Sequence, residues 1–315
     1  MNKKMFNKEI KQMGAFQFSV PSGHMNFQLG HLNIIIVTDG IGYYDKNCFA
    51  PGIARGEVNQ LLDDHYIESE YFELAHNILV IQTGDRTVLV DAGNGDGSEK
   101  SVGRLPENLL HAGISLQSVT DIVLTHAHPD HINGLINKEN TLVFPHADVH
   151  LSKTEYNFWM SATPDFSKSK NTIESCLFVQ QQAKDCFTIL GNQLKLFNEA
   201  EPLFDFLTPV LAPGHTPGHC MFAVSANDEM FIHMADIVHD EIILFSNPHW
   251  GTIFDIDFEL AATTRKDILD QFARSRQRVF SYHLPWPGFG YVQKVDSTYK
   301  WVQERYLTPQ FRKSI

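Results

Sequence analysis

The chain has 315 residues, of which 43% are hydrophobic, and a formal net charge of −12. This length can fill one large core, and because no Pro/Ser-rich linker divides the sequence we expect a single domain. The negative charge would repel phosphate backbones, so we expect no nucleic-acid partner. The four cysteines have no paired spacing, which indicates reduced thiols. No stretch approaches the 18 apolar residues that a membrane-spanning helix needs. We therefore expect a cytoplasmic protein that does not enter a membrane.

The N-terminal part of the chain has the weakest pattern. Residues 1–31 show no clear periodicity, and we predict an irregular extension there, followed by one domain over residues 32–315. The β-branched run from Leu32 to Thr38 predicts the first strand of that domain. The stretch from Ile41 to Glu73 carries aromatic residues in weak order, and it is either a functional loop or an ordinary surface excursion.

Alternating short apolar runs and helical patterns follow. They predict further strands over 77–82, 87–90, 122–124, 147–151, 206–211 and 220–224, and helices over 105–112, 153–160 and 171–190. The first two of these strands are expected to form a hairpin through the turn Gly84-Asp85. We expect an interruption of the last of these helices near Asp185. A further helix that packs against the core is expected after Asp257, which is a plausible N-cap. Because Pro209 lacks an amide hydrogen, the strand that contains it is expected at a sheet edge.

The highest density of metal-ligand residue types follows the buried run 122–124. His126, His128, Asp130 and His131 lie within six positions. In an extended chain, residues two apart face the same way, so the first two histidines can reach one ion. A proline then turns the chain, and the next two residues would open a helix directed at a second position. Such groups are costly to bury unless they bind a cation or pair with one another. The alternative is a polar loop whose histidines cap turns.

The motif His-x-His-x-Asp-His after a hydrophobic strand resembles the signature of the metallo-β-lactamase superfamily. Later motifs arrive in the order of that superfamily: Gly-His-Thr-Pro-Gly-His over 214–219, Asp236 after an apolar run, and His283 after another. The resemblance implies an α/β fold, an αββα sandwich of two mixed sheets flanked by helices. The segment 281–290 and the pair Phe158-Trp159 resemble the methyl parathion hydrolase branch, which implies a homodimer.

The resemblance also implies seven ligands for two divalent metal ions. The first ion would be held by His126, His128 and His215, the second by Asp130, His131 and His283, and Asp236 would bridge both. Zinc is favoured, and manganese, iron or cobalt would also suit such a site. Asp91 would orient a histidine ligand from behind, unless it is only a turn cap, and His219 would support the site from outside the ligand set.

The implied reaction is hydrolysis by a hydroxide that bridges the two metals and attacks a carbonyl or phosphoryl centre. Asp130 and Asp236 are the expected catalytic carboxylates, and Asp130 would orient the hydroxide. Histidine at position 128, where diiron redox relatives carry glutamate, favours hydrolysis over redox chemistry. Asp236 stands where β-lactamases of the main type carry a cysteine ligand, which argues against β-lactam substrates.

Aromatic residues near the ligand loops predict an apolar substrate pocket. They are Phe158, Trp159, Trp250, Phe254, Trp286 and Phe289. An apolar pocket above a metal centre would select a small hydrophobic ester-like molecule, and we expect a lactone or an aryl ester. Phosphotriester hydrolysis is the first alternative. A catalytically silent metal-binding protein and a mononuclear iron dioxygenase like the persulfide dioxygenases are the others.

Overall fold

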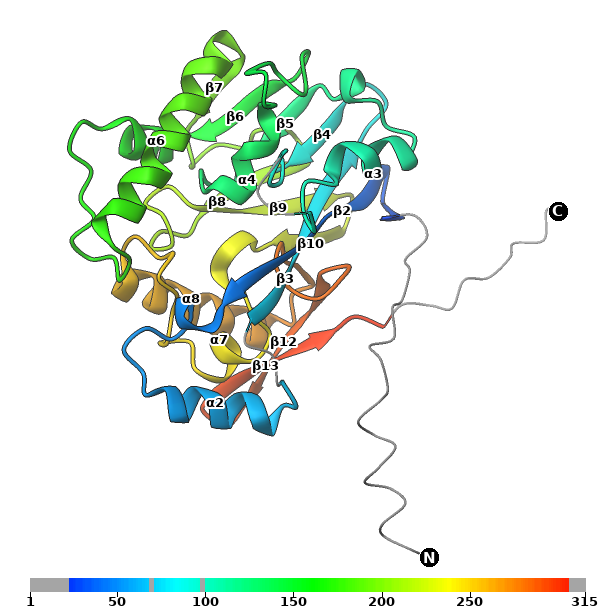
Figure 1. Cartoon of the computed structure of the whole chain (residues 1–315). Helices are drawn as coiled ribbons and strands as arrows, with labels where there is room; N and C mark the ends of the chain where they lie inside the picture. Colours follow the sequence, from blue (N-terminus) through cyan, green and yellow to red (C-terminus); the bar gives the residue numbers. More distant parts are fainter. Residues whose placement is uncertain (1–22, 68–70, 97–99, 306–315) are drawn as a thin grey trace, which may run out of the picture.

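The computed structural model describes residues 23–67, 71–96 and 100–305. Their strands form two mixed sheets (Figure 1). The first sheet has the strand order β1 (His24–Leu29), β2 (Leu32–Asp45), β3 (Tyr71–Gln82), β4 (Thr87–Val90), β5 (Asp121–Val123), β6 (Asp148–Ser152) and β7 (Leu194–Phe197). The second has the order β13 (Thr298–Gln303), β12 (Phe289–Val295), β11 (Val279–Phe280), β10 (Glu229–His233), β9 (Cys220–Ala226) and β8 (Leu207–Leu211).

The helices cover the outer faces of the two sheets. They are α2 (Arg55–Asp64), α3 (Leu105–His111), α4 (Pro129–Ile132), α5 (Lys153–Met160), α6 (Ile173–Leu190), α7 (Ile243–Ser246) and α8 (Phe258–Ser275). One apolar cluster, the first outer core, joins the first sheet to α3, α5 and α6. A second cluster, the second outer core, joins the other sheet to α2, α7 and α8. A third cluster, the inter-sheet core, fills the space between the sheets. The result is the predicted αββα sandwich.

Sequence patterns explain where the elements begin and end. The parallel strands β4 and β5 are short and mainly apolar because both of their faces are covered. Asp257 caps α8 as predicted, since its carboxylate accepts a hydrogen bond from the backbone N–H of Leu260 at 3.1 Å. The predicted hairpin of β3 and β4 is present, and β8 lies at the edge of its sheet as expected.

Several expectations need correction. The extension predicted over residues 1–31 contains strand β1, which pairs with β2 along its whole length, whereas residues 1–22 lie outside the described residues. Helix α6 is continuous through Asp185. Strands β7, β12 and β13 were not expected. The stretch from Ile41 to Glu73 extends β2, forms α2 and contributes Phe49 and Phe72 to the second outer core, so most of its described part is neither a loop nor a surface excursion.

The topology brings the ligand candidates to one place. Strands β8, β10 and β11 run in the same direction, because β8 and β10 both lie antiparallel to β9 and β11 lies parallel to β10. The residues that follow them carry His215, Asp236 and His283. The His-x-His motif follows β5 in the other sheet, so the site forms where ends of the two sheets meet. No helix of the described segments is long and apolar enough to cross a membrane.

Candidate metal centre

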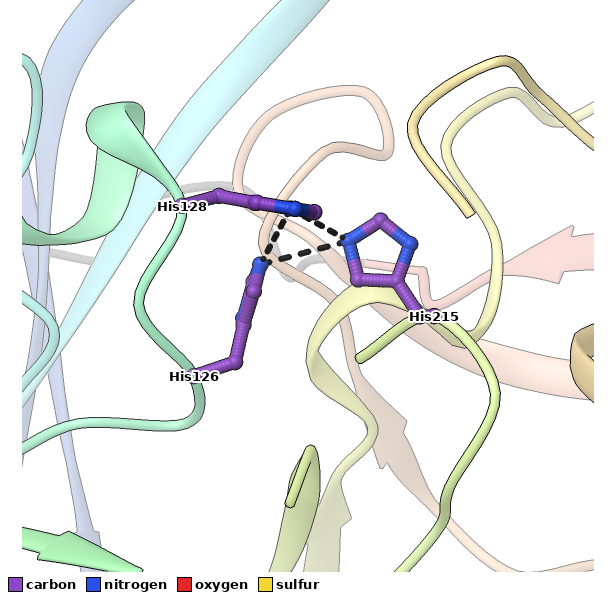
Figure 2. Close-up of side chains that lie close together, drawn as sticks. All are labelled: His126, His128 and His215. Carbon is purple, nitrogen blue, oxygen red and sulfur yellow. Dashed lines mark hydrogen bonds between the residues drawn. The ribbon is translucent and has the colours of Figure 1, made fainter. Parts of the chain in front are cut away.

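Three imidazole nitrogens converge at the end of β5 (Figure 2). His126 Nε2 lies 3.0 Å from His128 Nδ1, which lies 2.9 Å from His215 Nε2, and the third side of the triangle measures 3.2 Å. All three residues are buried. Three nitrogens this close together could all bind one zinc ion, for which the usual Zn–N bond length is ~2.0–2.1 Å.

The protonation of these rings suits a cation. Burial lowers the pKa of His126 and of His128 well below the usual value, and the neighbouring imidazoles lower both further. Both rings are therefore neutral near pH 7 and offer lone pairs. His215 donates its Nδ1 hydrogen to Asp255 at 2.9 Å, which leaves its Nε2 lone pair directed into the triangle.

A second group of ligand atoms adjoins the first. His131 Nε2 and His283 Nε2 lie 3.3 and 3.1 Å from Asp236 Oδ2, and they lie 3.7 and 3.4 Å from Asp130 Oδ2. The same oxygen of Asp236 is 3.5 Å from His215 Nε2. One carboxylate oxygen thus lies close to both groups, so Asp236 could bind an ion at either of them.

Buried polar atoms without partners show that this group fits a second ion. His131 Nε2 and Asp236 Oδ1 have no hydrogen-bond partner although both are buried. Such groups are costly unless something compensates them. The outer nitrogens are in contrast satisfied, because His131 Nδ1 donates to Asp91 at 2.9 Å and His283 Nδ1 donates to the carbonyl of Ala75 at 3.1 Å. The inward nitrogens face the carboxylate of Asp236 and could bind a cation in place of a proton.

The two residues expected outside the ligand set do contact it. Asp91, at a positive φ of 69° after β4, holds His131 and also accepts a hydrogen bond from the backbone N–H of Thr125 at 2.8 Å. His219 Nε2 accepts a hydrogen bond from the backbone N–H of Asp236 at 3.1 Å, and its Nδ1 donates to a carbonyl. Each therefore fixes the position of one candidate ligand, His131 or Asp236.

Two further histidines lie at the centre that the sequence patterns did not predict there. His76 on β3 has its Nε2 3.5 Å from Asp130 Oδ2, and His239 has its Nε2 3.3 Å from Asp236 Oδ2. Burial lowers the pKa of His239 to about 4, so its ring is neutral near pH 7. The sequence held one indication that His239 lies at the centre, namely its position three residues after Asp236. His76 lies inside a strand far from any motif, and only folding brings it to the site.

A buried ion pair behind His215 was also missed. Asp255 binds His215 through one oxygen, and its other oxygen lies 3.2 Å from Arg265 Nη2 on α8. Arg265 also donates to the carbonyl of Ile237, which directly follows Asp236. Burial would raise the pKa of Asp255, but the arginine and His215 outweigh it and hold that pKa well below its usual range. The charged pair links two ligand segments.

A cavity of about 460 Å³ opens above the metal-ligand groups. The residues that line it include the candidate ligands His128, Asp130, His215, Asp236 and His283. Its apolar lining consists of Tyr44, Leu74, Cys176, Phe178, Val179, Ile253, Phe254 and Ile256, and further polar lining residues are Asn94, Asn133, Asn171 and Gln182. The site therefore combines the candidate ligands with a mainly apolar lining.

The structure brings only one of the six predicted pocket aromatics, Phe254, to the wall of this cavity. Trp250 is buried in the second outer core, and Phe289 is buried in the inter-sheet core. Trp286 packs against the inter-sheet core. Phe158 packs against the first outer core and Trp159 lies within it, with its ring 5.8 Å from that of His128. Aromatic residues near ligand loops therefore mostly support the loops from behind.

The metallo-beta-lactamase superfamily model matches residues 71–283, and the chain belongs to this superfamily. It is a metal-dependent hydrolase, in keeping with the two groups of ligand atoms.

The solved structures that are similar to the chain include the following three. The dizinc quorum-quenching lactonase AidC, in complex with the product N-hexanoyl-homoserine, is 34% identical over 91% of this chain and 99% of its own, with a TM-score of 0.86. The hydrolase AbOPH of the beta lactamase superfamily is 26% identical over 91% and 99%, with a TM-score of 0.82. A probable metal-dependent hydrolase from Staphylococcus aureus is 17% identical over 90% and 100%, with a TM-score of 0.71. No curated protein sequence matches the chain.

Proposed function

We propose that this hydrolase opens lactone rings that carry an acyl side chain, at a dinuclear zinc centre held by the seven predicted ligands. The observation that carries the proposal is the convergence of two ligand groups on one oxygen of Asp236 beneath a mainly apolar cavity. The likeness to a dizinc lactonase over 91% of the chain supports it.

Two divalent ions would supply a nucleophilic water and polarise a carbonyl, so no serine or cysteine nucleophile is required. The residues of the chain prepare the site for this chemistry. Asp91 fixes the His131 tautomer that presents Nε2 inward, and Asp255 does the same for His215. Asp130 lines the cavity, and its carboxylate is the acceptor we assign to the proton of the attacking water.

The shape and polarity of the cavity favour an acylated lactone. The apolar walls suit an acyl chain, whereas the amides of Asn133 and Gln182 suit a polar group near the ring. Asn133 lies three residues after Asp130, which places it about one helical turn from the centre. Gln182 Oε1 is buried and has no partner, so it is free to accept a hydrogen bond from an amide of the substrate.

The test is the initial hydrolysis rate of the zinc-loaded protein on N-hexanoyl homoserine lactone, an aryl ester and an aryl phosphotriester. We expect the lactone to have the highest kcat/KM. Preference for the aryl ester or the phosphotriester would contradict the lactonase assignment. No turnover of any of the three by protein that binds two zinc ions would instead favour the catalytically silent metal-binding protein.

Membership of the methyl parathion hydrolase branch, a homodimeric state and a cytoplasmic location stay predictions from the sequence. Sedimentation of the purified protein would test the dimer. Zinc is proposed over manganese, iron and cobalt because imidazole-rich sites suit it and because the similar lactonase AidC is a dizinc protein. Metal analysis of protein purified without added metal would test this choice.

A further inference from the structure

Glu155 on α5 is a fully buried carboxylate with four hydrogen-bond donors. Its Oε1 accepts from the backbone N–H of Ala127 at 3.0 Å and from Trp159 Nε1 at 2.7 Å. Its Oε2 accepts from Thr216 Oγ1 at 2.7 Å and from the backbone N–H of Gly218 at 2.8 Å. One side chain therefore joins the His-x-His loop to the loop after β8.

These contacts lie directly beside the three imidazoles of the first ligand group. Ala127 stands between His126 and His128, and Thr216 follows His215. Trp159 packs its ring against that of His128. Each loop that supplies a ligand of this group is thus held by Glu155 at a neighbouring residue. The second ligand group has no comparable contact with it.

The position of Glu155 in its helix indicates that this arrangement is not ordinary helix capping. Ser152 and Glu155 form the pattern Ser-x-x-Glu, in which the glutamate usually turns back to the N-cap backbone N–H at the helix surface. Here both of its oxygens point inward and bind other donors. Glu199 contacts the start of the helix instead, since it accepts hydrogen bonds from Ser152 Oγ and from the backbone N–H of Thr154.

Within the part of the chain that the structure describes, Glu155 has no cationic side chain as a partner. The buried carboxylates that form ion pairs include Asp91, Asp121, Asp236 and Asp255. The groups that act on Glu155 are instead its hydrogen-bond donors and the surrounding burial. A buried carboxylate is costly without a cation, and hydrogen bonds offset only part of that cost. A cation among the neighbouring imidazoles would supply the missing charge.

We propose that Glu155 is a positioning residue for the first metal. Glu155 holds the two loops that carry the ligands of this metal in register, and the charge of the metal in turn stabilises the Glu155 carboxylate. The inference rests on the proposed dinuclear centre. It predicts that Glu155 controls the affinity of one of the two metals and leaves the other largely unaffected.

The test is Glu155→Gln. In either orientation, the new amide group faces a backbone N–H, of Ala127 or of Gly218, so one of the loops loses its acceptor. Changes behind a metal ligand typically weaken metal binding ~10–100-fold. In chelator competition, we expect the variant to release one of its two zinc equivalents at a 10–100-fold lower chelator concentration. We also expect a changed visible absorption spectrum of the cobalt-loaded protein.

Glu199→Gln is the matched control, because it alters a carboxylate at the same helix that touches neither ligand loop, and it should retain both metals like the wild type. Thr216→Val is a milder second variant that removes one donor beside His215, and it should weaken the same metal to a smaller extent. Wild-type metal affinities together with a wild-type cobalt spectrum, in either Glu155→Gln or Thr216→Val, would overturn the proposal, even if the melting temperature of that variant fell. Failure of the wild type to bind two metals would contradict the proposed function instead.

Discussion

His233 lies in the inter-sheet region beside the metal centre, where burial lowers the pKa of its imidazole to about 3 from an ordinary value of 6.5. Between these two values the unfolded chain binds a proton that the folded chain does not, so stability falls as the pH falls. We expect His233→Asn, which retains an acceptor for the backbone N–H of Ala235, to flatten this dependence by up to ~1.4 kcal/mol per pH unit.

The measurement is urea unfolding of the metal-free protein at several pH values between 6.5 and 4. An equal slope of unfolding free energy against pH in the variant and the wild type would mean that His233 is protonated in the folded state, or that it contributes nothing to acid sensitivity.

Breaking the ion pair of Asp255 and Arg265 should lower the free energy of unfolding by more than the substitution of His233 changes it. Both side chains are almost fully buried, so removal of one leaves the other as an unpaired buried charge. We expect Asp255→Ala to lower the free energy of unfolding by ~3–5 kcal/mol and to weaken metal binding at His215. Lys168→Met, which breaks an exposed pair with Asp257, is the control and should change stability little. Similar melting temperatures for the two variants would contradict the account.

At this scale the sequence predicted the seven residues that converge at the centre but not their neighbours. His126, His128 and His131 share one short motif, so their spacing alone carried the information. His76 and Glu155 lie within regular elements, where the pattern is the same for a structural residue. Their proximity to the centre depends on how β3 and α5 pack, and no local spacing encodes that packing.

Helix α6 forms one wall of the cavity through Cys176, Phe178 and Val179. We expect Val179→Phe to fill part of the chamber and to select against long acyl chains. The ratio of kcat/KM for decanoyl to butanoyl homoserine lactone should fall about tenfold or more, since one crowded methylene or ring contact costs ~1–3 kcal/mol.

Leu177→Phe is the matched control for this experiment, because its side chain is exposed on the adjacent position of the same helix and does not line the cavity. A similar loss of long-chain activity in both variants, or an unchanged ratio in Val179→Phe, would show that the chain occupies another part of the site.

The elements with a strong local pattern were predicted well. The hairpin of β3 and β4, helix α5 and the capped helix α8 have clear apolar periodicity or end signals. Strand β1 was missed because its sequence, His-Met-Asn-Phe-Gln-Leu, is half polar, and its conformation depends on pairing with the apolar β2. Helix α6 was expected to break at Asp185, but that side chain is exposed and a single polar residue does not end a helix.

At the scale of the whole molecule, the two sheets meet in a shared core of apolar side chains, and the ligand loops project from ends of their strands. The family resemblance predicted this sandwich, whereas composition and periodicity alone indicated only an α/β protein. The pocket aromatics were predicted poorly, because a large aromatic side chain near a loop is equally suited to the core behind it. Burial decides between the two, and burial is a property of the folded chain.

The central claim is that two metal ions act together at the joined ligand groups. The most direct test is a titration of zinc into the metal-free protein, with hydrolysis of N-hexanoyl homoserine lactone measured at each step beside Asp236→Ala. We predict that activity rises until two zinc equivalents per chain are bound, and that Asp236→Ala, which lacks the oxygen shared by both groups, loses nearly all turnover. Full activity at zero or one equivalent, or wild-type turnover in the variant, would contradict a dinuclear mechanism.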